Sequence, residues 1–189
     1  MAEDLLRRKL AHGFAMLDAD GDGFLTERDH EVMGRRSAAG IGIAPGDDWE
    51  IRLEDAYREV WRRALQPHAD ESGRLDVDGF VAAVQEIAKD AQAAEESFGR
   101  LASAYFDVAD RDLDEFLDLD EYRAFVNGIT PSLDDEETAR GFAHMDTDED
   151  GAISRPELVA AVLDFWTGTE PGGPGSHFLG DPSRYGGDA

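Results

Sequence analysis

Residues 146–157 read DTDEDGAISRPE, and this stretch decides the fold. Oxygen-bearing side chains recur at positions 1, 3, 5, 9 and 12 of the stretch, and glycine stands at position 6. Ca²⁺ takes about six to eight oxygen ligands, so alternating carboxylates on a tightly turning chain suit it. Gly151 can adopt the positive φ that such a turn needs. The pattern predicts a calcium loop closed by both carboxylate oxygens of Glu157 and by the main-chain carbonyl at position 7.

Two other stretches repeat this spacing. Residues 18–29 (DADGDGFLTERD) keep aspartate at positions 1, 3 and 5 and glycine at position 6, but end on Asp29 instead of glutamate. Residues 110–121 (DRDLDEFLDLDE) place carboxylates at positions 1, 3, 5, 9 and 12, but Glu115 replaces the glycine at position 6. A side chain in the left-handed region costs about 1–2 kcal/mol, so we expect backbone strain at Glu115. The chain therefore carries three candidate calcium loops.

A fourth stretch, residues 68–79 (HADESGRLDVDG), keeps the frame of the loop but loses its ligands. His68 and Gly79 replace the first and the last carboxylate. Because the last carboxylate supplies two oxygens, we expect no Ca²⁺ there. His68 is interpreted as a substituted loop residue, with a site for another metal as the alternative. We number the four stretches loops 1 to 4 in chain order and expect loop 2 to serve the structure alone.

Apolar residues at helical spacing flank the loops and predict a helix on each side. Thr26, Asp118 and Ser154 each stand three residues before an acid, a pattern that begins a helix. The helix entering loop 4 is expected to begin at Thr130-Pro131 or at Ser132. The apolar stripes comprise Leu6, Leu10, Phe14 and Leu17 before loop 1, Phe98, Leu101, Tyr105 and Phe106 before loop 3, Tyr122, Phe125 and Val126 after it, and Phe142, Met145, Leu158 and Val162 around loop 4.

The interval between loops 1 and 2 holds a linker at 37–48 and a long predicted helix at 49–65. The glycines of the linker suggest a phosphate-binding loop as an alternative, but no Gly-Lys-Ser/Thr follows them. Packing in the core is favoured over a ligand-binding role for the large side chains of the helix. These are Trp49, Tyr57, Val60 and Trp61.

The apolar residues at position 8 predict how the loops pair. Leu25 is expected to meet Leu75 in one short two-stranded bridge, and Leu117 to meet Ile153 in another. Loop 2 keeps this leucine, which explains why a loop without ligands persists. The expected division is residues 1–89 for the first pair, 90–167 for the second pair and 168–189 for a tail.

Composition agrees with a folded, ion-dependent protein. The 189 residues include 43 acidic and 18 basic side chains, for a net charge of −25, and 41% are hydrophobic. Three Ca²⁺ ions would bring the charge to about −19, so the ion-free chain should repel itself. Such a charge disfavours nucleic acid and anionic membranes as partners. With no cysteine, no apolar leader and no run of membrane-spanning length, the sequence predicts a cytoplasmic location.

The chain resembles the sarcoplasmic calcium-binding protein and calerythrin family of EF-hand proteins. The resemblance lies in three complete loops, a degenerate second loop, a long connection between loops 1 and 2, and the aromatic DFW near the end of the last helix. The resemblance covers about residues 3–167. It implies an all-α fold of four EF-hands (helix–loop–helix units) in two paired lobes, packed into one compact protein. It also implies a role as a Ca²⁺ buffer or carrier. We expect a monomer.

The ligand set carries over onto the matching loop positions and implies about three Ca²⁺ per chain. Because Asp29 is shorter than glutamate, loop 1 is expected to bind Ca²⁺ weakly or to favour Mg²⁺. The expected side-chain ligands are Asp18, Asp20, Asp22 and Asp29 in loop 1, Asp110, Asp112, Asp114, Asp118 and Glu121 in loop 3, and Asp146, Asp148, Asp150, Ser154 and Glu157 in loop 4, with the carbonyls of Phe24, Phe116 and Ala152.

Buffer and sensor are the two functions that the loops leave open. A sensor exposes an adaptable groove that is often rich in methionine, and this chain has only four methionines. The sequence therefore favours a buffer, with a sensor that regulates a target protein as the alternative. An enzyme is not indicated, because the chain has no cysteine and its five histidines are scattered. Among these, His144 is expected to face solvent.

The last stretch, residues 167–189 (TGTEPGGPGSHFLGDPSRYGGDA), is rich in glycine and proline. Its plain interpretation is a flexible terminus. Phe178, Leu179 and Tyr185 are apolar anchors within it, however. The alternative is that Phe178 and Leu179 fold back into the apolar cleft between the two lobes, which would disfavour a sensor.

Overall fold

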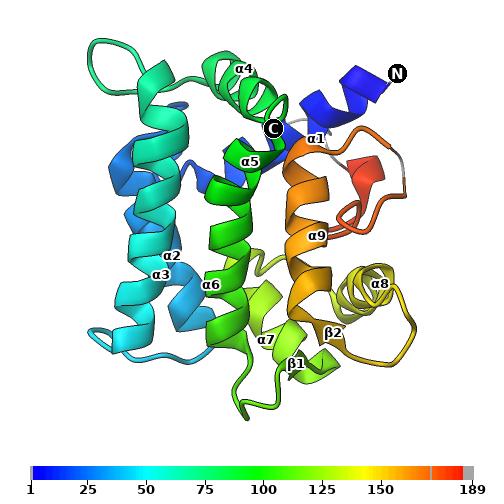
Figure 1. Cartoon of the computed structure of the whole chain (residues 1–189). Coiled ribbons are helices and arrows are strands. Elements are labelled where there is room, and N and C mark those ends of the chain that lie inside the picture. Colours follow the sequence, from blue (N-terminus) through cyan, green and yellow to red (C-terminus); the bar gives the residue numbers. More distant parts are fainter. Residues whose placement is uncertain (1, 171, 185–189) are drawn as a thin grey trace.

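The computed structural model describes residues 2–170 and 172–184, and these form a helical protein with one very small sheet (Figure 1). No helix in this described part is long and apolar enough to cross a membrane. The helices are α1 (Ala2–Leu17), α2 (Glu27–Gly40), α3 (Asp48–Val60), α4 (Val77–Ile87), α5 (Ala91–Ala94), α6 (Arg100–Ala109), α7 (Leu119–Ile129), α8 (Asp135–Met145) and α9 (Arg155–Thr167).

Short irregular helices and two strands complete the chain. The π-helix η1 (Trp61–Leu65) extends α3, and the π-helix η3 (Glu95–Gly99) joins α5 to α6. The predicted long helix at 49–65 is thereby confirmed, although its last turn is wider than an α-helix. The remaining elements are the 3₁₀ helices η2 (Gln66–His68) and η4 (Pro182–Arg184) and the strands β1 (Phe116–Leu117) and β2 (Ile153–Ser154).

The loops pair as their position-8 residues predict. Leu25 and Leu75 exchange both main-chain hydrogen bonds, at 2.8 and 3.0 Å between N and O. Strands β1 and β2 pair antiparallel, with Leu117 opposite Ile153. All four side chains are buried. Loop 2 therefore contributes to the fold through its leucine although it lacks the carboxylates of the other loops.

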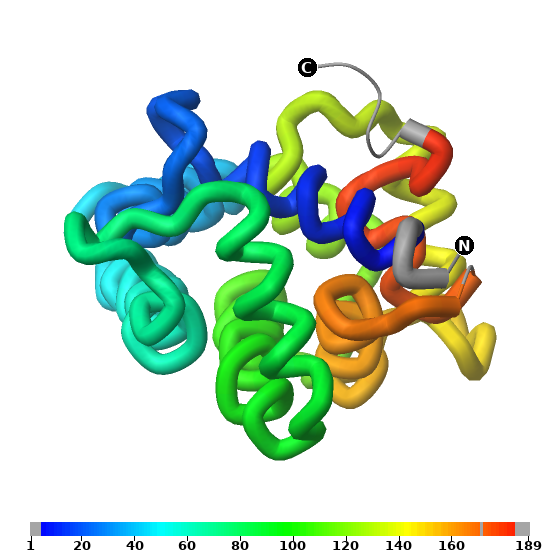
Figure 2. The backbone as a smooth tube through the Cα atoms, turned by 90° about the horizontal axis from the view of Figure 1, so that it is seen from above, coloured from blue at the N-terminus to red at the C-terminus, as the bar shows by residue number. Residues whose placement is uncertain are grey.

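The two lobes share one apolar core, as expected for a single compact protein. The predicted stripes on α1, α6, α7 and α9 are buried in it. Aromatic rings connect the lobes directly: Phe80 on α4 lies 5.8 Å from Phe14 and 6.0 Å from Trp166, measured between ring centroids. Tyr57 on α3 lies 5.8 Å from Tyr105 on α6. Viewed from above, the elements of the two lobes lie side by side in one body (Figure 2).

Helices α2 and α7 cross at a pair of glycines. A Cβ atom built on Gly40 would lie 2.0 Å from the Cα of Gly128, and one built on Gly128 would lie 2.7 Å from the carbonyl oxygen of Ser37. Both neighbours are main-chain atoms, which cannot move aside by a change of rotamer. The exit helix of loop 1 and the exit helix of loop 3 thus approach more closely than side chains would allow.

Replacing Gly40 with alanine is expected to lower the free energy of unfolding by about 1–3 kcal/mol, because the two helices must separate to admit the methyl group. Denaturant unfolding of the Ca²⁺-loaded protein measures the change. Asn127→Ala, an exposed neighbour of the crossing on α7, is the control and should stay within about 0.5 kcal/mol. Equal stability of Gly40→Ala and the parent would show that the crossing is not close in solution.

Three local predictions are wrong. Helix α8 begins after Asp134, and not at Thr130 or Ser132, because the Asp134 carboxylate accepts the N–H of Glu137 at 2.9 Å and completes a capping box. The linker is shorter than predicted, since α2 continues to Gly40. Trp49 is 36% exposed and not in the core, whereas the other three large side chains named on that helix are buried.

Lys9 is a buried charge that the sequence did not single out. It is fully buried, and its Nζ donates to the carbonyl oxygens of Asp164 at 2.7 Å and Gly168 at 2.9 Å. Burial lowers the pKa of Lys9, and the charge of the Asp164 carboxylate opposes that shift. A cation beside the carbonyl end of a helix is favourable, so Lys9 fastens α1 to the end of α9.

The tail packs on the core and is not a free terminus over its described part. Phe178 and Leu179 are 2% and 4% exposed. The Phe178 ring lies between Phe125 on α7 and Phe165 on α9, at 6.3 and 5.9 Å between centroids. Both rings belong to the second lobe, while the carbonyl oxygen of Leu179 accepts from His12 on α1, and both tail residues line a cavity with His30 and Tyr57 of the first lobe. The prediction that this pair folds back onto the core where the lobes meet is thereby confirmed. Tyr185, the third anchor suggested by the sequence, lies outside the described residues.

Candidate metal centres

Three loops gather their carboxylates into tight groups. In each group one oxygen from every residue lies within 4.8 Å of the others. Like charges this close repel one another strongly unless a cation lies between them. The described residues form no such group in loop 2. The groups are Asp18, Asp20 and Asp22 in loop 1, Asp110, Asp112 and Glu121 in loop 3, and Asp146, Asp148 and Glu157 in loop 4.

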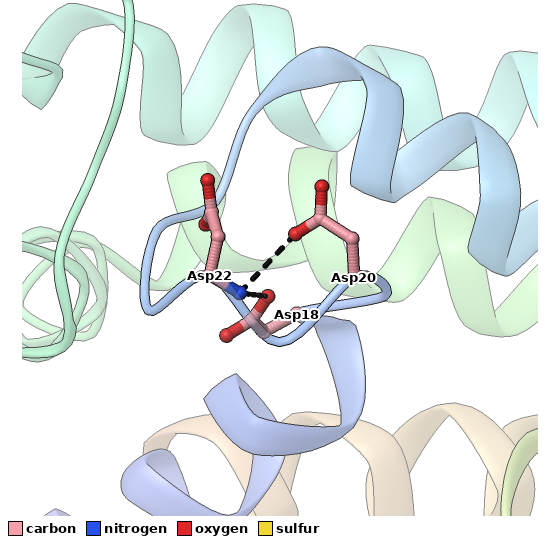
Figure 3. Close-up of side chains that lie close together, drawn as sticks. All are labelled: Asp18, Asp20 and Asp22. Atoms are coloured by element: carbon pink, nitrogen blue, oxygen red, sulfur yellow. Dashed lines mark hydrogen bonds between the residues drawn. The ribbon is translucent and has the colours of Figure 1, made fainter.

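Main-chain N–H groups hold the carboxylates of Asp18 and Asp20 in place, and Figure 3 shows the two bonds that the N–H of Asp22 donates. The Asp18 carboxylate accepts from Gly21 at 2.9 Å, from Asp22 at 3.2 Å and from Gly23 at 2.9 Å. Asp20 also accepts from the N–H of Asp22, at 3.2 Å. Because the main chain of the loop folds around these carboxylates, the bonds orient them without the help of an ion.

Loops 3 and 4 repeat the bonds from positions 5, 6 and 7 of this arrangement. The carboxylate at position 1 accepts the N–H groups of positions 5 and 6, at 3.2 and 3.1 Å in loop 3 and at 3.1 and 3.0 Å in loop 4. The carboxylate at position 5 accepts the N–H of position 7 in all three loops, at 2.9, 2.9 and 3.0 Å. The residues at position 7 are those whose carbonyls the sequence assigns as ligands: Phe24, Phe116 and Ala152.

The acid at position 12 ties the end of each loop to its start. Glu157 accepts the N–H of Thr147 at 2.8 Å and that of Ser154 at 2.9 Å. Partial burial alone would raise the pKa of Glu157, but hydrogen bonds from Ser154 and Thr147 hold it below its usual value. By contrast, burial and then the negative charges of its loop neighbours raise the pKa of Asp148. The hydrogen bonds thus favour the ionised form of Glu157, whereas the surrounding negative charges disfavour that of Asp148.

The three capping boxes predicted from the sequence are all present. In each, the position-12 acid serves the exit helix as well as the loop: Asp29 for α2, Glu121 for α7 and Glu157 for α9. The Asp118 carboxylate accepts the N–H groups of Asp120 and Glu121, both at 2.8 Å. Its role in the helix start therefore competes with its predicted role as a ligand.

Loop 1 differs from loops 3 and 4 at its last acid. Asp29 accepts the N–H groups of Ala19 and Thr26, at 3.2 and 2.8 Å, which matches the bonding of the glutamates in the other loops. The glutamates of loops 3 and 4 also join the carboxylate groups described above, whereas the group in loop 1 is made of its first three aspartates. Asp29 thus makes the same main-chain bonds as the glutamates but is not part of the carboxylate group of its loop.

Loop 3 carries the expected strain and a second strained position. Glu115 has φ +71°, where loops 1 and 4 have glycine at +83° and +91°. Leu113 at position 4 has φ +63°. Side chains in this region cost about 1–2 kcal/mol each. The loop is therefore rich in charge and strained, as the sequence predicts.

Replacing Glu115 with glycine is expected to strengthen Ca²⁺ binding at loop 3 by about 5- to 30-fold, because the ion-bound loop would no longer hold a side chain at positive φ. Calorimetric titration of the variant and the parent measures this. Glu149→Gln, at an exposed non-ligand position of loop 4, tests whether loss of one surface charge alone changes affinity. Unchanged or weaker binding by Glu115→Gly would contradict the account of strain.

Loop 2 keeps its turn without its ligands. Gly73 has φ +73°, and the Asp70 carboxylate accepts the N–H groups of Ser72 and Arg74 at 2.8 and 3.0 Å. The Arg74 guanidinium lies 4.3 Å from the centroid of the Phe24 ring in loop 1. Loop 2 thus carries a positively charged side chain of its own, Arg74. His68 ends η2, and the described residues place no metal-ligating group of three around it.

Two polar features away from the loops were missed or misjudged from the sequence. His144 is half-buried and not solvent-facing, because its ring stacks on that of His177 in the tail, with 4.2 Å between centroids. Only knowledge of where the tail lies could have predicted this contact. In the core, His30 donates from Nδ1 to the carbonyl oxygen of Thr26 at 3.0 Å. Burial lowers its pKa to about 4, so the ring is neutral at neutral pH.

The His30 ring lies at an apolar cavity between the lobes. Its Nε2 atom is buried and has no hydrogen-bond partner. The cavity has a volume of ≈ 30 Å³. Its lining includes Tyr57 and Tyr105, whose hydroxyls bond to each other, and the tail residues Phe178 and Leu179. Two residues of the tail thus form part of the wall of this cavity.

Paired helix–loop–helix units with acidic twelve-residue loops define a calcium-binding protein of the EF-hand class. The family model described as EF hand matches residues 10–28 and 139–163. The chain is 30% identical to a sarcoplasmic calcium-binding protein from Perinereis vancaurica tetradentata, over 69% of this chain and 74% of that protein. It is 25% identical to calerythrin from Saccharopolyspora erythraea, over 89% and 93% of the two chains. The chain belongs to the EF-hand family of sarcoplasmic calcium-binding protein and calerythrin.

A solved structure extends the likeness over nearly the whole chain. The coelenterazine-binding protein from Renilla muelleri, in its calcium-loaded apo form, matches with a TM-score of 0.67 and 25% identity. The match covers 95% of this chain and 97% of that chain. The family match and the geometry of the acidic loops thus both indicate calcium binding through EF-hands.

Proposed function

We propose that this protein is a cytoplasmic Ca²⁺ buffer with three working sites, in loops 1, 3 and 4. Residues 1–89 and 90–167 form its two EF-hand pairs, and it acts as a monomer without an enzymatic role. Loop 4 is the best-formed site and loop 1, closed by Asp29, is the weakest and the one most open to Mg²⁺. Support comes from the carboxylate groups in these three loops and from the absence of such a group in loop 2 over the described residues.

The ligands that we propose are those at the loop positions already described. In loop 4 the first three aspartates, the carbonyl of Ala152 and both oxygens of Glu157 account for about six oxygens, and a water held near Ser154 adds a seventh. Loop 3 has the same set with Asp118 at position 9. Six added positive charges leave the loaded protein acidic, so Ca²⁺ removal is expected to destabilise it through repulsion.

The observation that favours a buffer over a sensor is the position of Phe178 and Leu179. A sensor exposes an apolar groove on binding Ca²⁺. In this chain the corresponding space between the lobes is occupied by its own tail, with both side chains buried. Site affinities near ~10⁻⁸ M or tighter are expected for a buffer, against ~10⁻⁷–10⁻⁵ M for a sensor.

A hydrophobic dye distinguishes the two roles. Dye fluorescence with the full chain should rise little on adding Ca²⁺, because the tail keeps the cleft closed. Removal of residues 170–189 should expose apolar surface, lower the melting temperature and increase dye binding. A large Ca²⁺-dependent rise with the full chain would instead support the sensor.

A second candidate function is the binding of an apolar small molecule between the lobes. The buried Nε2 of neutral His30, an acceptor with no partner, favours it, since a ligand donor could satisfy that atom. The cavity of ≈ 30 Å³ is far below the roughly 300 Å³ of a small-ligand pocket, so the tail would have to move. Coelenterazine, which the Renilla muelleri protein is named for binding, is a suitable probe. Quenching of tryptophan fluorescence in the tail-deleted chain supports this function, and no quenching contradicts it.

A further inference from the structure

The carboxylate of Glu157, the last acid of loop 4, accepts hydrogen bonds on both oxygens from two residues. Its Oε1 atom accepts the N–H of Thr147 at 2.8 Å and the hydroxyl of Thr147 at 2.9 Å. Its Oε2 atom accepts the N–H of Ser154 at 2.9 Å and the hydroxyl of Ser154 at 2.8 Å. Thr147 is the second residue of the loop and Ser154 is the ninth. The two oxygens are therefore fixed from opposite ends of the loop.

The hydroxyl at position 2 distinguishes loop 4 from the other loops. In loop 1 that position is Ala19, whose N–H donates to Asp29 at 3.2 Å. In loop 3 it is Arg111, whose N–H donates to Glu121 Oε1 at 2.8 Å. Loops 1, 3 and 4 thus share the main-chain bond from position 2, whereas only Thr147 adds a hydroxyl to it.

The orientation of this carboxylate matters because Ca²⁺ and Mg²⁺ use a carboxylate differently. Ca²⁺ accepts both oxygens of one carboxylate in a flexible geometry, whereas Mg²⁺ demands a near-ideal octahedron and keeps several waters. One oxygen of Glu157 lies within 4.8 Å of oxygens from Asp146 and Asp148. These like charges repel one another without an ion. Bonds on both oxygens hold Glu157 in the group and oppose a rotation that would present one oxygen alone.

We propose that Thr147, which is not itself a ligand, is a positioning residue that sets the preference of loop 4 for Ca²⁺ over Mg²⁺. Its hydroxyl and its N–H together fix Oε1, so that Glu157 meets the ion with both oxygens. Groups that orient a metal ligand through hydrogen bonds change metal affinity by about 10- to 100-fold. Thr147 is exposed, so a smaller effect is expected. The inference rests on the proposed Ca²⁺ site in loop 4 and adds a determinant of its selectivity.

Thr147→Val tests the hydroxyl, because valine keeps the branched shape and the main-chain N–H. Titration of the full chain in chelator-buffered Ca²⁺ can follow loop 4 alone by the NMR signal of the Gly151 amide, which bonds to Asp146. The Ca²⁺ affinity of loop 4 should fall by about 3- to 10-fold and its Mg²⁺ affinity by less than about twofold. Thr147→Ser keeps a hydroxyl and should bind both ions like the parent. Equal effects on the two ions in Thr147→Val, or an equal loss in Thr147→Ser, would overturn the proposal, because a merely structural role produces them.

Loop 3 offers the reciprocal test. Arg111 is exposed, and its N–H already bonds to Glu121. Arg111→Thr supplies the missing hydroxyl, and Arg111→Val supplies the same shape without it, so that comparing the two cancels the loss of positive charge. The threonine variant should bind Ca²⁺ in loop 3 about 3- to 10-fold more tightly than the valine variant, with no comparable gain for Mg²⁺. Equal Ca²⁺ affinities would contradict the role of the hydroxyl.

A measurement without Ca²⁺ tests the positioning itself. The ion-free full chain is used at about 1 M salt, which screens repulsion between the carboxylates to ~3 Å and should keep the chain folded. NMR couplings of the Glu157 side chain should show one rotamer in the parent and an average of rotamers in Thr147→Val. Averaging in both proteins overturns the inference.

The parent protein separates failure of the inference from failure of the proposed function. No uptake of Ca²⁺ by loop 4 of the parent would overturn both the proposed site and the role of Thr147. Uptake with the same Ca²⁺ to Mg²⁺ preference in the parent and in Thr147→Val would overturn the inference alone.

Discussion

Phe178→Ala lowers the free energy of unfolding of the Ca²⁺-loaded protein by about 3–5 kcal/mol, the range for truncating a buried phenylalanine. The ring packs against Phe125 on α7 and Phe165 on α9, and it lines the cavity that residues of both lobes enclose. Polar contacts also hold this segment: the N–H of Gly175 donates to the Asp164 carboxylate at 3.1 Å, His12 Nε2 donates to the carbonyl oxygen of Leu179 at 3.3 Å, and the His177 ring stacks on His144. Loss of the ring should leave a cavity and loosen the tail, because the ring is the largest buried side chain of this segment.

Chemical denaturation measures this loss, and dye fluorescence reports on release of the tail. Ile51→Ala truncates a large apolar side chain that is 47% exposed. It should cost much less, within about 1 kcal/mol. If the tail closes the cleft, Phe178→Ala both destabilises the protein and raises dye binding. A change below about 1 kcal/mol with no added dye binding would mean that the tail does not close the cleft in solution.

Glu157→Gln weakens Ca²⁺ binding at loop 4 by at least ~100-fold, because a neutral amide replaces the charged group expected to give two of about seven oxygens. Glutamine has the same length, and its one carbonyl oxygen can still accept the N–H of Ser154, although it cannot also accept that of Thr147, which bonds the other oxygen of Glu157. The capping bond at the start of α9 can therefore survive, and the loss should appear in metal affinity far more than in helix content.

Calorimetric titration should then find one tight site fewer in Glu157→Gln. The matched control is Glu149→Gln, the same substitution in the same loop at an exposed position with φ +58° that is not a ligand. It should change affinity at loop 4 only by the few-fold expected from one surface charge. Equal losses in the two variants would show that net charge, and not coordination by Glu157, governs binding.

Much of the fold follows from short-range rules that the sequence displays. Carboxylate spacing located the loops, and residues at position 8 predicted both bridges, Leu25 with Leu75 and Leu117 with Ile153. The positive φ of Glu115 followed from its place in the loop. These features depend on residues close together in the chain or on the pairing of repeated loops, so the sequence pattern is sufficient to predict them.

Features that depend on distant packing were not predictable in the same way. The burial of Lys9 requires the end of α9 to lie beside α1, and the stacking of His144 on His177 requires the path of the tail. The exposure of Trp49 depends on where the α2–α3 connection meets loop 3. The start of α8 was mispredicted for a local reason. Thr130-Pro131 and Ser132 are competing start signals just before it, but the helix begins after Asp134, whose carboxylate forms a capping box with Glu137.

Calcium titration by calorimetry, with and without Mg²⁺, tests the central claim most directly. Three Ca²⁺ per chain are predicted, matching the three carboxylate groups in loops 1, 3 and 4. Mg²⁺ should compete most at the weakest site. A stoichiometry of four would contradict the assignment of loop 2 as empty, and zero or one would contradict the proposal of a three-site Ca²⁺ buffer.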